Sequence, residues 1–106
     1  MGLQRTVTCP GPLPPWPAVR AHLSEAGLPL LMRMIDGQPA FPDEDPPDDW
    51  RELRVAAPAG MVTLRRQPGG VTVLVWGNAD NSLQSAAATL AQALADLTGG
   101  HIQSDD

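Results

Sequence analysis

The carboxylates that could do chemistry are concentrated in one stretch of the sequence, PAFPDEDPPDDW, at residues 39–50. It holds four prolines and five acidic residues, which are Asp43, Glu44, Asp45, Asp48 and Asp49. Oxygen-rich loops can bind calcium, but the common calcium loop alternates its ligands and needs a glycine at a sharp turn. This stretch lacks glycine and carries Pro46 and Pro47 at its centre. We therefore expect neither a metal ion nor another cofactor there.

The excess negative charge of the chain comes from this stretch alone. The sequence has 12 acidic residues and 7 basic residues, all of them arginine, for a net charge of −5. Without the five acids named above, the remaining acids and the arginines balance. No basic surface is expected that could neutralise phosphates, which disfavours nucleic acid and anionic membranes as partners.

The same stretch is suited to protein binding. Prolines hold a segment extended and reduce the entropy that it loses on binding. Clustered carboxylates steer a partner that has a basic surface. Phe41 and Trp50 flank the acids, and they either fix the ends of the loop to the core or contact the partner as anchors. We expect the five acids, Phe41 and Trp50 to form the partner-binding site.

Nucleophilic catalysis has weak support in this sequence. Cys9 and His22 could lie near each other, but no glycine-rich elbow or oxyanion-forming loop accompanies them. His101 lies in an expected tail, and two histidines with one cysteine give no zinc-binding spacing. We expect no catalytic residues.

The alternative is a small enzyme or ligand-binding domain. Its pocket would contain Asp36, the acidic loop, Trp50 and Trp76. Carboxylates gathered beside an aromatic ring could raise one pKa into a catalytic range.

Alternating and helical patterns predict the elements that must position these residues. Strands are expected at 3–9, 28–35, 52–57, 61–67 and 71–77, with a short returning strand near 38–41 after an Asp36-Gly37 turn. The run at 28–35 is apolar on both faces, which predicts an interior strand. Turns at PAG and PGG predict an antiparallel arrangement of the last three strands.

Two helices complete the predicted fold. The first begins near Trp16, with prolines in its first turn, and stops at Gly27. The second begins with Asp80 or Asn81 as its N-cap, and it runs to about Leu97 before Gly99 and Gly100 end it. The sequence therefore predicts a single α+β domain over residues 1–98. Its mostly antiparallel sheet would have about five strands and carry both helices on one face, as a two-layer sandwich. The acidic loop would span residues 42–49, and residues 99–106 would form a flexible tail.

The second helix has an unusually uncharged outer surface, rich in alanine. A solvated helix normally displays more charged residues, and small side chains permit close approach of another chain. We expect an interface with a partner or with a second copy of the chain, which would be a homodimer, at Ala88, Ala91, Gln92 and Ala95.

The function expected from the sequence is protein binding without catalysis, as in a small acidic adaptor, a chaperone-like protein or an inhibitor-like protein. A single cysteine cannot form an internal disulfide, and the start of the sequence has no apolar run typical of a signal peptide. We therefore expect the cytoplasm as its location.

Overall fold

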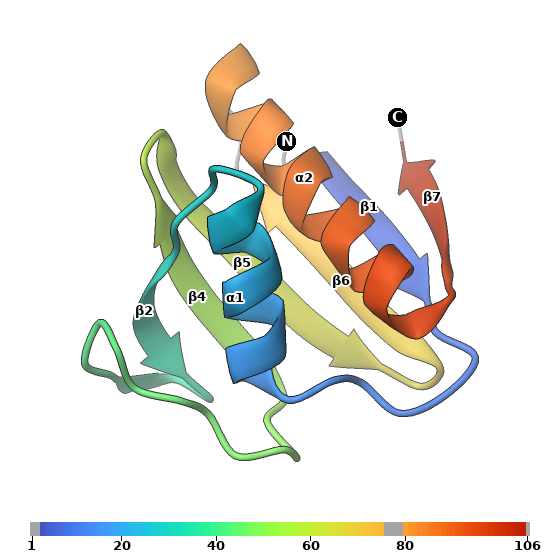
Figure 1. The fold of residues 1–106 in the computed structure, drawn as a ribbon, viewed down its shortest axis with the longest axis horizontal. Coiled ribbons are helices and arrows are strands. Elements are labelled where there is room, and N and C mark those ends of the chain that lie inside the picture. Colours follow the sequence, from blue (N-terminus) through green and yellow to red (C-terminus); the bar gives the residue numbers. More distant parts are fainter. Residues whose placement is uncertain (1–2, 76–79, 106) are drawn as a thin grey trace.

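The computed structural model describes residues 3–75 and 80–105, which contain two helices and one seven-stranded antiparallel sheet (Figure 1). The elements in chain order are β1 (Leu3–Thr8), α1 (Trp16–Glu25), β2 (Leu31–Ile35), β3 (Gln38–Pro39), β4 (Glu52–Ala57), β5 (Gly60–Gln67), β6 (Gly70–Val75), α2 (Asn81–Thr98) and β7 (His101–Asp105). The sheet order is β3-β2-β4-β5-β6-β1-β7. The α+β class is confirmed, but the expected number of about five strands was too low.

Strands β4, β5 and β6 form the predicted antiparallel meander. Side chains of β4 alternate between half-buried and buried positions, and all residues of β6 are buried. Val55 pairs with Val62, and Leu64 pairs with Val73, so apolar residues from successive strands share one face of the sheet. This face forms the core.

Both helices lie over that same face (Figure 1). Helix α1 buries Trp16, Val19 and Leu23 at helical spacing, with prolines at its start as expected. Asp80 caps α2, because its Oδ1 accepts the N–H of Leu83 at 2.9 Å, and Gly99 ends the helix in a left-handed conformation with φ of 72°. Neither helix within the described residues is long and apolar enough to span a membrane.

The C-terminal segment corrects the prediction of a flexible tail at residues 99–106. His101–Asp105 form β7, which pairs with β1 in the register Thr6↔Gln103. The chain turns back because the N–H of Gly100 donates to the carbonyl of Ala95 at 2.9 Å. Ile102 is the one apolar residue of the strand, so the sequence lacks the alternation that normally marks a strand.

Strand β2 is an interior strand of the sheet, as predicted, but it is not covered on both of its faces. Its neighbours are β4 and the two-residue β3, and its register shifts between Met32 and Met34. Met32 is buried, whereas Leu31 is 51% exposed. The apolar character of residues 28–35 therefore does not reflect burial on both faces.

Candidate functional site

The acidic loop, residues 42–49, joins β3 at one edge of the sheet to β4 (Figure 1). Its C-terminal end is fixed by Trp50, whose side chain is 4% exposed and belongs to the hydrophobic core. The guanidinium carbon of Arg66 lies 4.6 Å from the centroid of the indole ring, a distance typical of cation–π contact. Arg66 Nη2 also donates to the carbonyl of Asp48 at 2.8 Å. Trp50 and Arg66 therefore hold the loop onto the sheet.

The N-terminal end of the loop is held by backbone hydrogen bonds from β2. The N–H of Met32 donates to the carbonyl of Pro42 at 3.0 Å, and the N–H of Ala40 donates to the carbonyl of Arg33 at 3.0 Å. Pro46, in the middle of the loop, is buried. The loop is thus attached at both ends and at its centre.

One acidic side chain of the loop is tied to a helix. Arg20 of α1 makes an ion pair with Asp45, with 2.7 Å between Nη1 and Oδ1. Both side chains are more than a third exposed, so the pair contributes about 0.2–1 kcal/mol. Among the described ion pairs, this is the one that involves the acidic loop, and it links the loop to the helical layer.

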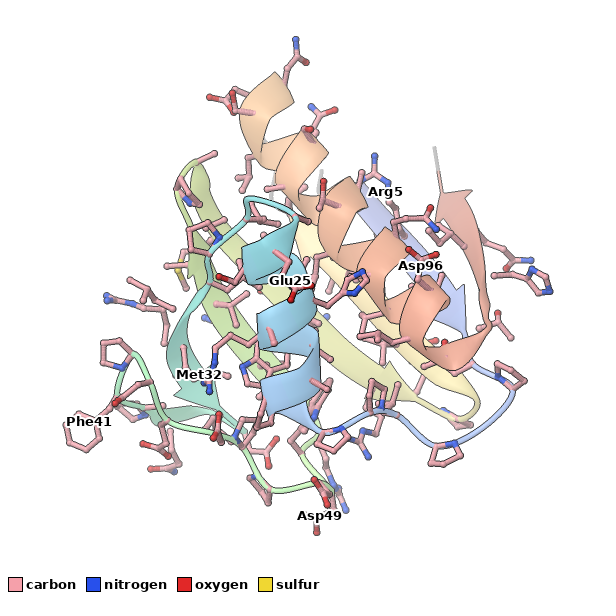
Figure 2. All side chains as sticks on the ribbon, viewed as in Figure 1. Arg5, Glu25, Met32, Phe41, Asp49 and Asp96 are labelled. Carbon is pink, nitrogen blue, oxygen red and sulfur yellow. The ribbon has the colours of Figure 1, made fainter. Side chains whose placement is uncertain are left out.

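Phe41 lies in a tight turn beside the acids. Its N–H donates to Glu44 Oε1 at 3.2 Å, and the N–H of Glu44 donates to its carbonyl at 3.0 Å. Phe41 is 75% exposed, and its side chain projects away from the body of the molecule (Figure 2). Asp43, Glu44, Asp48 and Asp49 are also exposed. Of the two aromatic residues expected in the partner-binding site, Phe41 is therefore accessible to a partner, whereas Trp50 fixes the end of the loop to the core.

Asp36 stabilises the start of β4. Its Oδ1 accepts the N–H groups of Arg51 at 2.7 Å and Glu52 at 2.9 Å. These hydrogen bonds from Glu52 and Arg51 favour the carboxylate and lower the pKa of Asp36 below its ordinary value of 3.8. A carboxyl group that acts as a general acid at neutral pH needs a raised pKa, whereas the pKa of Asp36 is lowered.

The expected carboxylate and tryptophan pocket is not assembled by the described residues. A shallow depression of about 400 Å³ is lined by Asp36, Gly37, Arg51 and Glu52, without any residue of the acidic loop. Trp50 is buried in the core, and Trp76 lies outside the described residues. No group of metal-binding side chains occurs in the described part of the chain.

Cys9 and His22 line different cavities. Cys9 is buried beside the turn between β5 and β6, whereas His22 lines a groove between α1 and α2. The cysteine–histidine arrangement considered from the sequence is therefore not formed.

The alanine-rich surface expected on α2 is largely used inside the single chain. Ala91 is fully buried and Ala95 is 6% exposed, whereas Ala88 is half-buried. Gln92 is exposed and donates to Asp96 Oδ1 at 2.8 Å. Small residues here allow close packing of α2 within the chain, which corrects the expectation that Ala91 and Ala95 contact a partner.

Arg20 and Arg66 were not singled out from the sequence, although both hold the acidic loop. Arg66 could have been found from the hairpin register. The turn at residues 58–59 sets Glu52 opposite Arg65, so residue 66 comes opposite residue 51 and next to Trp50. The pairing of Arg20 with Asp45 depends on where α1 packs and has no local signal.

No protein-family model, no curated protein and no solved structure matches this chain.

The two aromatic residues should differ sharply in their contribution to stability. We expect Trp50→Ala to lower the free energy of unfolding by about 3–5 kcal/mol, because it removes a buried ring and the stacking partner of Arg66. Phe41→Ala is the matched control and should change it by less than about 0.5 kcal/mol, since the ring is exposed. Urea unfolding measures both. Equal losses for the two variants would contradict the assignment of Trp50 as the anchor of the loop.

Asp36→Asn should reduce stability in a manner that depends on pH. The pKa of Asp36 is lowered in the folded state, so its ionisation stabilises the fold fully above the ordinary value of 3.8 and loses this effect as the pH falls toward the lower folded pKa. The gap in unfolding free energy between wild type and variant should therefore be largest near neutral pH and shrink below about pH 4. A gap that widens on acidification would contradict this role.

Proposed function

We propose that this protein is a non-catalytic protein-binding module that docks through the acidic loop onto a basic surface of its partner. The observation that carries the proposal is that the acidic loop holds the excess negative charge and is also attached firmly to the fold. The entire excess charge of the chain lies in this loop, and Trp50, Arg66 and Arg20 hold the loop against the fold. A loop that is already ordered loses little conformational entropy when it binds.

The exposed residues of the loop have complementary roles in this proposal. Asp43, Glu44, Asp48 and Asp49 attract and orient a basic partner, because long-range attraction speeds encounter and disfavours acidic surfaces. Phe41 supplies an apolar contact among these charges, and aromatic residues commonly contribute more binding energy than the charges around them. Asp45 acts through its ion pair with Arg20 by keeping the loop near α1.

Such a module would act as an adaptor, a chaperone-like protein or an inhibitor that covers a basic site. We propose that it acts in the cytoplasm. We also propose that its partner is a protein and that it binds neither nucleic acid nor a membrane. The lack of a basic stripe and the single buried cysteine support this proposal.

The test compares two double variants of equal net charge. Asp43→Asn with Asp49→Asn removes two charges from the acidic loop, and Glu25→Gln with Asp96→Asn removes two exposed charges from the helices. Each pair brings the net charge from −5 to −3. Affinity capture from a lysate of the native host, with mass spectrometry at low and high salt, compares both with the wild type.

We expect the loop variant to bind the captured partner about 2-fold to 30-fold more weakly at low salt, because each of the two exposed charge pairs that it loses contributes about 0.2–1 kcal/mol. The helix control should bind like the wild type, and added salt should remove most of the difference. Equal retention by all three chains, or no retained protein with the wild type, would contradict the proposed function.

A further inference from the structure

The two edges of the sheet differ in how well they are protected. Exposed strand edges present unpaired N–H and C=O groups, and proteins usually block them with proline, bulges, short strands or covering segments. At one edge, β3 has two residues, including Pro39, and leads into the acidic loop. At the other edge, β7 has five residues without proline and pairs with β1 without a shift in register. No described element lies beyond β7 (Figure 1).

The directions of the backbone groups of β7 follow from the hydrogen bonds of its neighbours. The N–H of Cys9 donates to the carbonyl of Gly69 at 2.7 Å, so Cys9 directs its backbone groups toward the β6 side. Successive residues of an antiparallel strand alternate in direction, so Thr6 and Thr8 direct theirs toward β7. Their register partners are Gln103 and His101. The residues between and beyond them, Ile102 and Ser104, therefore direct their N–H and C=O groups away from the sheet.

We propose that a second copy of this chain pairs with the first along β7, antiparallel and about a two-fold axis at Gln103. This register sets Ile102 of each copy opposite Ser104 of the other, so their outward N–H and C=O groups form reciprocal hydrogen bonds. It also sets His101 of each copy opposite residue 105 of the other, so the pairing covers the whole length of β7. The two sheets become one continuous sheet.

This pairing is independent of the acidic loop, and it goes beyond the proposed function. The loop and β7 lie at opposite edges of the sheet. A dimer formed through β7 therefore leaves both acidic loops exposed at its two outer ends. A partner that carries two basic sites would then be bound through both loops, with the gain in avidity that linkage provides.

The test compares two variants of Ser104, only one of which removes the outward backbone N–H. Ser104→Pro removes the outward N–H and places the proline ring at the edge, where proline is tolerated because the β1–β7 hydrogen bonds do not use this group. Ser104→Ala is the matched control, since it keeps the N–H. Sedimentation equilibrium from about 5 µM to about 500 µM then measures the dimer dissociation constant of each chain.

We expect the wild type and Ser104→Ala to pass from 11.2 kDa toward twice that mass as concentration rises. Ser104→Pro should raise the dissociation constant at least about tenfold, because each copy loses a hydrogen bond and gains a steric clash. A strict monomer for the wild type, or equal dimerisation by Ser104→Pro and Ser104→Ala, would overturn the proposal.

Amide hydrogen exchange of the wild type gives a second test that needs no variant. In dilute solution the amides of Ile102 and Ser104 should exchange quickly, while that of Gln103 is protected by β1. At high concentration the amides of Ile102 and Ser104 should become protected as well. Exchange of these two amides that does not change with concentration would refute pairing along β7.

Discussion

The burial of Trp50 beneath Arg66 is the interaction on which the acidic loop depends. Five acidic side chains within seven residues repel one another, and a free segment of this composition would spread into solvent. The indole ring is buried in the core, and the Arg66 guanidinium covers it while holding the carbonyl of Asp48. The Arg66 side chain therefore stacks on the indole ring of Trp50 and also donates a hydrogen bond to the backbone of the loop. Such a contact contributes about 0.5–2 kcal/mol when it is partly desolvated.

The remaining contacts limit where the loop can go. Asp36 fixes the first residues of β4 after Trp50, the backbone of β2 holds Pro42, and Arg20 attaches Asp45 to α1. These contacts come from three different elements, so the loop is positioned by the fold as a whole. The charged side chains that make none of these contacts remain exposed, which is the arrangement that a docking surface for a basic partner needs.

Much of the fold could be predicted because its signals are local. The PAG and PGG turns predicted the β4–β6 meander. The capping residue Asp80 and the terminal glycine Gly99 predicted the two ends of α2. Strand β7 could not be predicted, because its polar sequence has no alternation and its order comes from pairing with β1, nearly a hundred residues earlier. The exposed face of β2 was missed for a related reason, since an apolar run does not reveal which of its faces will be covered. Likewise, the sequence identified the carboxylates of the candidate site, but the pairing of Arg20 with Asp45 depends on where α1 packs.

We expect the acidic loop to be ordered before any partner binds. The most direct test is the backbone ¹⁵N order parameter of its non-proline residues, which are Asp43, Glu44, Asp45, Asp48 and Asp49, in the isolated wild-type protein. We expect values of about 0.85, similar to those of the strands, because the loop is attached at both ends and at its centre. Values below about 0.6 would show a flexible segment and would contradict the attachment of the loop by Trp50, Arg66 and Arg20.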